Sequence, residues 1–482
     1  MLQLLIETLI AVLTVPVLLY SFYTAFLLYG SLRYKPLQRT NASRRPVVTV
    51  LMAVYNEKEV VGMSLDAVSN LNYPCSLLQV LVADDSTDET AGIVRTKVAE
   101  MRVKGIDAEV CSRDTREGFK AGALNGAVSR AKGEYVLLLD ADSTVPPDVV
   151  KAGLAALESR QDLSFVSFRV GHYNREANLV TRAFALFQDT TDTLQKMGSS
   201  RLGLPFSFQG GFAMVRVEAL RRAGYWTPGC LADDADLSCR IYEAGGSGYY
   251  LSETVVESED PWALHVWKRQ FARVAEGWAQ VLRLHSGKIL RTKRMNAMAK
   301  AALLMTLLSP FASLSWLVVT FVSAFGIVLN AVQPQSSLFN SPVYQSLLAV
   351  PVAAFYAAGV QSLRRRGKLS ARNILLLPQV SYLVSGMFVV SAAGFLRGIA
   401  GRSGIFVRTP KKGMGGSGYS TDAKFDGTAA SELLLGSLAV ALSVLLILRL
   451  QLFLGLSLLG FGAFTLKSMQ LTRLVAGGAR KG

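Results

Sequence analysis

A stretch without any charged side chain, from Ala301 to Leu363, is the feature that most constrains how this chain can fold. A membrane-spanning helix needs about 20 predominantly apolar residues, so this stretch is long enough for two. A second apolar stretch covers residues 1–33, and it lacks the charged start and the small-residue cleavage site of a signal peptide. We therefore expect a membrane protein with a retained N-terminal anchor.

The chain carries 51 Lys and Arg against 35 Asp and Glu, and the cations cluster beside the apolar stretches. One cluster follows the first expected span, and another follows the third: Arg33, Lys35, Arg39, Arg44 and Arg45, then Arg364, Arg365, Arg366 and Lys368. Positive residues flank spans on their cytoplasmic side. The pattern places the segment between these clusters in the cytosol, at the cell membrane, and it argues against nucleic acid as a partner. The four cysteines have no metal-ligand spacing and are expected to be reduced.

The order of charged and apolar segments predicts six regions along the chain. A stretch at Ile374–Leu396 has cations on both sides, which favours a re-entrant or interfacial helix over a crossing. The chain is then expected to cross the membrane about five times. The regions are an N-terminal transmembrane helix at 1–33, a cytosolic domain at 44–262, amphipathic interfacial helices at 263–300, two transmembrane helices at 301–363, an interfacial or re-entrant helix with a loop at 372–425, and a C-terminal transmembrane hairpin at 430–470.

The cytosolic segment alternates short apolar runs with helical patterns. Such βα units predict a parallel, doubly wound sheet whose ligand binds at the carboxyl ends of the strands. Helices are expected at 59–70, 87–104, 178–196 and 233–244. The expected strands are Val47–Met52, Leu78–Ala83, Asp107–Cys111, Tyr135–Leu139, Phe165–Arg169 and Phe212–Val215.

Acidic residues follow three of these strands. Asp140 and Asp142 flank Ala141 at a strand-to-loop corner, a pattern that suits Mg²⁺ or Mn²⁺ bridging a diphosphate, although an acidic loop without a ligand has the same sequence. Glu57, Asp84 and Asp85 are expected at the same sheet edge. Five converging carboxylates repel one another, and a bound metal ion or nucleoside is the simplest way to reduce this repulsion.

Three further elements are candidates for the same site. Lys120 lies in a glycine- and alanine-rich segment before a helix, where a diphosphate can approach the backbone. Asp234 opens an expected helix and suits a catalytic base, although helix capping also explains acidic residues there. Gln270 and Arg273 share one helix face, either as site residues or as a polar stripe.

Together and in this order, these motifs resemble those of membrane-integrated family-2 glycosyltransferases, the group of cellulose, hyaluronan and chitin-oligosaccharide synthases and ceramide glucosyltransferases. The likeness covers residues 47–290 and a segment at 406–411. It implies a GT-A fold in a cytosolic domain inserted between transmembrane helices. It also implies a nucleotide-sugar donor, with uridine diphosphate favoured, and Mg²⁺ or Mn²⁺ as cofactor.

The resemblance implies a role for each matching residue. Asp234, within Ala232-Asp233-Asp234, would be the base of an inverting reaction, and Asp140 and Asp142 would hold the ribose and the metal. The nucleotide sugar would be held by Tyr55, Glu57, Asp84, Asp85, Lys120, Gln270, Arg273 and, in the gating segment Phe406–Lys411, Thr409 and Lys411. The acceptor would be lined by Gln209, Gly210, Gly211, Asp233 and Trp278.

One departure from the family pattern bears on the product. The family's Q-x-x-R-W motif ends here in Val274, which cannot stack on an acceptor sugar, and Trp278 is a candidate substitute one turn later. The leading expectation is a β-linked polysaccharide passed through the chain's own spans. The alternative is single addition to a membrane lipid. A non-enzymatic sugar-binding scaffold is disfavoured by the intact acidic residues.

Overall fold

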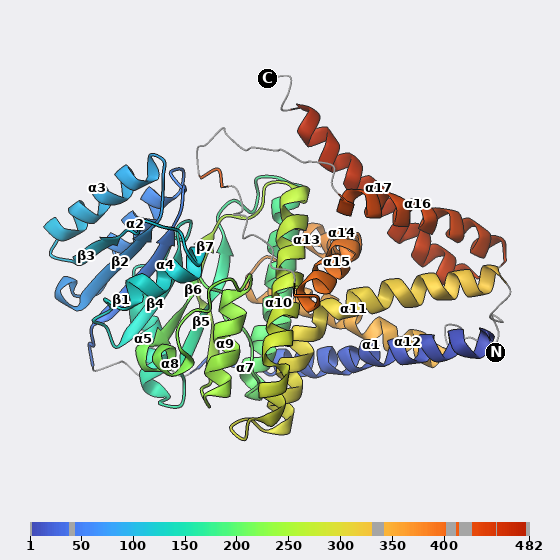
Figure 1. Cartoon of the computed structure of the whole chain (residues 1–482), viewed down its shortest axis with the longest axis horizontal. Coiled ribbons are helices and arrows are strands. Elements are labelled where there is room, and N and C mark those ends of the chain that lie inside the picture. The colour runs from blue at the N-terminus through green and yellow to red at the C-terminus, as the bar shows by residue number, and fades with distance from the viewer. Residues whose placement is uncertain are drawn as a thin grey trace.

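The computed structural model describes residues 2–37, 44–329, 342–401, 411–413, 427–449 and 451–478. A sheet domain and a group of long apolar helices lie at opposite ends of the chain's longest dimension (Figure 1). Helix α10, Leu264–Arg291, runs between them. The two parts meet along this helix, and the apolar helices α1 Leu2–Leu32 and α12 Pro342–Arg365 also contact helices of the sheet domain.

Seven strands form one mixed sheet in the order β3-β2-β1-β4-β6-β5-β7. Neighbours among β1 to β4 are parallel, whereas β6 runs antiparallel to both β4 and β5, and β5 pairs with β7 in parallel. The strands are β1 Val48–Val54, β2 Leu78–Asp84, β3 Asp107–Cys111, β4 Tyr135–Asp140, β5 Phe165–His172, β6 Phe212–Arg216 and β7 Gly248–Ser258.

All six predicted strands are confirmed, with ends that shift by a few residues, and β7 is the strand that the sequence pattern missed. Its middle, Ser252-Glu253-Thr254, interrupts the apolar run, and the β5–β7 pairing shifts register beside Phe168 and Arg169. The parallel strands β1 and β2 are buried along almost their whole length. That burial explains their continuous apolar sequences, since each fully buried Leu or Val side chain stabilises the fold by roughly 1.5–3 kcal/mol.

Helices of the sheet domain follow the βα pattern, and two short irregular helices join them. A capping box at Asn178 starts α6, because its side chain accepts from Thr181 N and Thr181 Oγ1 accepts from Asn178 N. The helices are α2 Val61–Ser69, η1 Cys75–Leu77, α3 Thr90–Val103, α4 Phe119–Val128, α5 Val149–Ser159, α6 Leu179–Asp192, η2 Thr193–Met197, α7 Gly198–Leu202, α8 Val217–Ala223 and α9 Asp233–Glu243.

Three helices in the described part of the chain are long and apolar enough to cross a membrane, at Ile6–Leu32, Ala297–Val328 and Ala429–Leu448. The segments Ala371–Ser385 and Phe388–Ile399 form a pair bent by 47°, as in a broken span or a re-entrant loop. The helices are α1 Leu2–Leu32, α11 Ala297–Val328, α12 Pro342–Arg365, α13 Ala371–Ile374, α14 Leu376–Ser385, α15 Phe388–Ile399, α16 Gly427–Leu448 and α17 Leu452–Gly478.

Helix α10 is fixed on its apolar-helix side by small residues and by ion pairs. Gly394 and Gly398 of α15 lie against it so closely that a Cβ at Gly394 would be 2.5 Å from Ala272 O. Two ion pairs join α10 to other helices: Lys268 Nζ of α10 lies 2.7 Å from Glu432 of α16, and Arg397 Nε of α15 lies 2.8 Å from Glu276 of α10. This packing holds in place the helix that carries Gln270 and Arg273.

Candidate functional site

The carboxyl ends of β1, β2 and β4 meet at one edge of the sheet, because the three strands are parallel neighbours. Val54 pairs with Asp84, and Ala53 pairs with Asp140. The loops that follow are joined by hydrogen bonds, for Asn56 N donates to Ser86 Oγ at 2.9 Å and Thr87 N donates to Asn56 Oδ1 at 2.8 Å. The predicted acidic edge is therefore formed.

Lysine and arginine side chains of the chain itself pair with the carboxylates at this edge. The sequence had suggested that a bound ligand would offset the repulsion among these carboxylates. Lys120 Nζ lies 2.6 Å from Asp140 Oδ1. Asp85 accepts two hydrogen bonds from Arg113, at 3.1 Å from Nε and 2.5 Å from Nη2. Arg113 was not predicted; its position shortly after β3, at the same sheet edge, was the available signal. It also donates to the carbonyls of Glu117 and Phe119, which shapes the loop before Lys120.

Asp142 lies just behind the edge and is 4% exposed. Its Oδ2 accepts from Ser258 Oγ at 2.7 Å, from Glu259 N at 3.1 Å and from Lys411 Nζ at 2.6 Å. Burial alone would raise the pKa of Asp142, but the Lys411 ammonium and these hydrogen bonds lower it. The carboxylate is therefore held in its charged form.

Residues 411–413 contact the segment after β7 by hydrogen bonds to Glu259. Lys411 Nζ donates to Glu259 O at 2.8 Å, and the amides of Lys412 and Gly413 donate to the Glu259 carboxylate at 2.7 and 2.9 Å. The Lys412 ammonium sits 4.6 Å from the centre of the Trp262 ring. Glu259 was not predicted from the sequence. Thr409 lies outside the described residues, as does the rest of the predicted gating segment before Lys411.

A second charged group faces Asp140 from α9 and α10. Burial raises the pKa of Asp234 to about 6, with the Asp233 charge adding to the effect. Burial also raises the pKa of Asp233. Burial alone would lower the pKa of Lys120, but the carboxylates around it raise that pKa. Burial lowers the pKa of Arg273, and three carboxylates oppose that shift, those of Asp234, Asp233 and Asp140.

Two glycines bring this group together. Gly210 N donates to Asp234 Oδ2 at 3.3 Å, and Gly210 lies between that carboxylate and Lys120. Gly211 lies directly against Asp140, where an added Cβ would be 2.8 Å from Asp140 N and in overlap with its carboxylate. The neighbouring Gln209 accepts from Lys196 Nζ at 2.7 Å. The predicted acceptor loop therefore borders the acidic edge.

We expect Gly211→Ala to lower any activity of this site by at least tenfold, and Gly210→Ala to leave it within about threefold. The added methyl group at position 211 must displace Asp140, and a misplacement of about 1 Å can cost about 100-fold in rate. At position 210 the nearest atom to the new methyl group would be Lys120 Nζ at 3.4 Å, an ordinary contact. Initial rates of both purified variants test this. Equal rates would show that Asp140 has room to move.

The remaining predicted residues lie at the margins of this group. Tyr55 has one ring face covered by the Arg116 guanidinium, 3.3 Å from its centre. The Gln270 Oε1 atom is buried and has no hydrogen-bond partner within the described part of the chain. Trp278 is half-buried against the main core, and Val274 is 38% exposed. Sequence spacing alone did not reveal these surroundings.

The aspartates fit a divalent cation that arrives with a diphosphate. Carboxylate oxygens are the ligands that Mg²⁺ and Mn²⁺ prefer, and Mg²⁺ is usually bound through one or two carboxylates plus substrate phosphates. Asp140 and Asp142 supply two such groups on one corner. Within the described residues, no group of three or more His, Cys, Asp or Glu side chains is arranged to hold a metal. Two carboxylates on one corner suit a cation whose other ligands come from phosphate and water.

Comparison with known proteins agrees with this geometry. Residues 135–359 match the family model for glycosyl transferase family group 2. The chain is 31% identical over 259 residues to glucomannan 4-beta-mannosyltransferase 1 of Oryza sativa subsp. japonica, covering 53% of this chain and 50% of that protein. It is 31% identical over 263 residues to glucomannan 4-beta-mannosyltransferase 2 of Arabidopsis thaliana, covering 54% and 49%. The chain spans about half the length of the curated relatives it matches.

A solved structure shows the same fold. The mannosyltransferase of Pyrobaculum calidifontis, in complex with GDP-Man and Mn²⁺, superposes with a TM-score of 0.53 at 24% identity, covering 75% of this chain and 99% of that one. The mixed sheet flanked by apolar helices is thus a GT-A-like architecture. The chain is therefore similar to the glycosyl transferase family group 2 over residues 135–359, and its sheet domain shares this fold.

Proposed function

We propose that this protein is an inverting glycosyltransferase that moves a hexosyl group from a nucleoside diphosphate sugar to an acceptor hydroxyl. The observation that carries the proposal is the group of Asp140, Lys120, Asp234 and Arg273 around Gly210 and Gly211. It sets a carboxylate with a pKa of about 6 beside cations suited to a diphosphate. A base of this pKa works near neutral pH.

In the proposed reaction, the acceptor oxygen attacks the anomeric carbon while Asp234 takes the hydroxyl proton. The bond between that carbon and the diphosphate oxygen breaks, and the nucleoside diphosphate leaves with the electron pair. A single displacement inverts the anomeric configuration. Lys120 and Arg273 would stabilise the negative charge that develops on the leaving group, where fixed charges in a partly buried site are most effective.

We further propose that Asp140 and Asp142 hold the divalent cation, Mg²⁺ or Mn²⁺. When bound, the cation would neutralise charge on the diphosphate. The nucleoside would lie along the loops after β1 and β2, against Tyr55, Glu57, Asp84 and Asp85. Lys411 and Gln270 would border the same donor. Gln209, Asp233 and Trp278 would face the acceptor.

For substrates, the names of the relatives support a mannosyl donor and a β-linked polysaccharide acceptor. The curated relatives are named as glucomannan 4-beta-mannosyltransferases, and the similar solved structure contains GDP-Man. These favour guanosine over the uridine diphosphate that the synthase resemblance implied. Single addition to a membrane lipid remains the second candidate, because the exposed Val274 cannot stack on a sugar as Trp would.

We also propose a multi-pass cell-membrane protein whose catalytic domain faces the cytosol. Three apolar helices of sufficient length and the cations that follow Leu32 and Leu363 support this placement. A polysaccharide product would leave through the apolar helices.

A donor panel tests the proposal. Purified full-length protein in lipid discs would be incubated with Mn²⁺ and radiolabelled GDP-mannose, GDP-glucose, UDP-glucose or UDP-N-acetylglucosamine. Separating the products into lipid-extractable and high-mass fractions then distinguishes glycolipid from polymer. We expect high-mass product from GDP-mannose. Label only in the lipid fraction would favour the second candidate, and no transfer from any donor would contradict both.

A further inference from the structure

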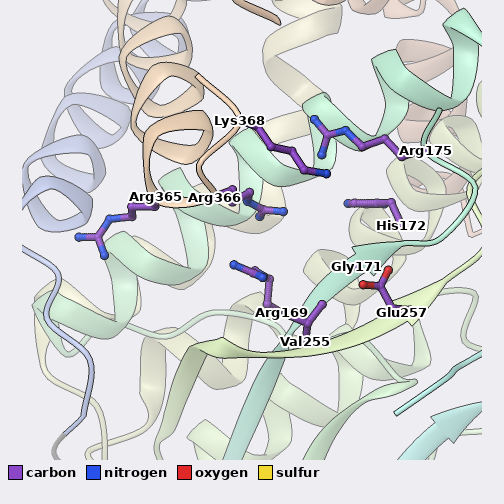
Figure 2. Close-up of a pocket in the computed structure, with 9 residues that line it drawn as sticks. All are labelled: Arg169, Gly171, His172, Arg175, Val255, Glu257, Arg365, Arg366 and Lys368. Carbon is purple, nitrogen blue, oxygen red and sulfur yellow. The ribbon is translucent and has the colours of Figure 1, made fainter. Parts of the chain in front are cut away.

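A basic cavity that shares no lining residue with the acidic edge lies between the sheet domain and the polar end of the apolar helices. Its volume is about 300 Å³. Figure 2 shows side chains around it from β5 and the turn after it, from β7, and from the end of α12 and the segment that follows. The lining residues are Arg169, Gly171, His172, Arg175, Val255, Glu257, Arg365, Arg366 and Lys368.

Positive charge dominates this lining, since five of the nine residues are Arg or Lys and one is a carboxylate. Burial alone would lower the pKa of His172, but its contacts with Asp260 and Asp189 raise that pKa to about 9. His172 is therefore protonated at neutral pH and adds a further charge.

The buried Asp189 carboxylate holds several of these cations in place. It is 2% exposed, and it lies 2.7 Å from Arg175 Nη1 and 3.0 Å from His172 Nε2. It also forms an ion pair with Arg366. The second ring nitrogen of His172 lies 2.7 Å from Asp260. A single carboxylate thus orders three cations from two parts of the chain, the end of β5 with the turn after it and the segment after α12, which preorganises the wall of the cavity.

Arg169 and Lys368, also in the lining, form no ion pair with a carboxylate of the described residues. The Nε atom of Arg169 is buried and has no hydrogen-bond partner in the described part of the chain. Burial and the nearby Arg366 charge lower its pKa, and the Asp189 and Glu257 carboxylates oppose that shift only in part. In Figure 2 the Lys368 ammonium points into the space beside Arg175 and His172. These groups are placed to bind an anion.

We propose that this cavity binds a phosphoryl group. Arginine forks match phosphate oxygens in pairs, and a pocket of several arginines and a lysine is suited to a doubly charged phosphate ester. The single carboxylate of the lining, Glu257, lies against Gly171 on the sheet side, opposite the segment after α12. The charge balance of the lining therefore still favours an anion.

The position of the cavity favours a phosphomonoester lipid headgroup as the source of that phosphoryl group. Arg365 Nη2 donates to Tyr34 O at 3.0 Å, two residues beyond the end of α1, which is long and apolar enough to cross a membrane. Basic pockets at the ends of spanning helices are suited to anionic headgroups. None of the lining residues belongs to the proposed donor site, so binding here does not depend on the proposed transfer reaction.

Binding of two probes to the full-length protein in uncharged detergent tests the proposal. The probes are short-chain phosphatidic acid and inorganic phosphate, titrated by calorimetry against wild type, Lys368→Gln, the Arg169→Gln/Lys368→Gln double variant and the control Arg364→Gln. Arg364 is exposed, lies on the same helix end and does not line the cavity. Lys368 is exposed, so its replacement should fold normally.

We expect Lys368→Gln to weaken binding of phosphatidic acid by about threefold to tenfold and the double variant by more than tenfold. Arg364→Gln should stay within twofold of wild type. Tighter binding of phosphatidic acid than of phosphate identifies a lipid headgroup as the source, and comparable affinities identify a soluble phosphate ester. Equal weakening in Arg364→Gln, or no binding of either probe to wild type, would overturn the proposal.

Discussion

Asp234→Asn should lower kcat by about 100- to 10,000-fold, the usual contribution of a positioned general base, with little change in donor affinity. The amide keeps the shape of the side chain and can still accept from Gly210 N, but it cannot take the acceptor proton. Initial rates and calorimetric titration of the nucleoside diphosphate separate the two effects. A variant that retains full turnover would exclude Asp234 as the base.

The same carboxylate predicts how activity and stability depend on pH. Because Asp234 has a pKa near 6, wild-type activity should fall as the pH drops through about 6. The raised pKa means that the folded state holds this proton more tightly than the unfolded state does. The charged form therefore costs stability above about pH 6, and the cost disappears as the pH falls towards 4. At pH 7, Asp234→Asn should consequently raise the thermal midpoint by a few degrees.

Asp236→Asn is the matched control, since it makes the same change two residues along α9. Asp236 is 1% exposed and contacts His285 at 2.8 Å and Arg240 at 2.6 Å. Its contacts lower its pKa against the effect of burial, so its charge stabilises the fold at neutral pH. Asp236→Asn should therefore lower the thermal midpoint while folded protein keeps its kcat. If both variants changed kcat and the thermal midpoint in the same way, a catalytic role for Asp234 and a structural role for Asp236 would be contradicted.

Asp142→Asn should abolish the effect of Mn²⁺ on nucleotide binding without weakening metal-free binding. Loss of an outer hydrogen bond to a metal ligand typically costs roughly 10- to 100-fold in metal affinity, and loss of a ligand should cost at least as much. The substitution also releases Lys411 from its ion pair, and the freed ammonium can contact a phosphate. We compare the dissociation constant of the nucleoside diphosphate measured in chelator with the one measured in Mn²⁺. The ratio of the two should therefore fall to about one.

Calorimetry with the nucleoside diphosphate measures this ratio, and Asp148→Asn is its control. Asp148 follows the same strand and accepts from exposed Asn72 at 2.8 Å, away from the acidic edge. It should keep the wild-type ratio. An unchanged ratio in Asp142→Asn would remove that residue from the metal site.

Much of the donor edge could be predicted because it depends on local sequence. Apolar runs such as Leu78–Ala83 are buried on both faces, and each ends where a parallel strand must end, so the position of Asp84 or Asp140 followed from the pattern. The long stretch Ala301–Leu363 likewise predicted apolar helices from composition alone. Asp234 at the start of a helix was also visible in the sequence.

Tertiary structure decided what surrounds those residues. The ion pairs of Arg113 with Asp85 and of Lys411 with Asp142 join segments 28 and 269 residues apart, and no local pattern encodes such pairing. The raised pKa of Asp234 depends on burial by chain segments distant in sequence. The basic cavity depends on β5, β7 and α12 meeting. Sequence by itself determined which side chains reach the sheet edge, and folding determined their charges and partners, because electrostatics depends on distance in space.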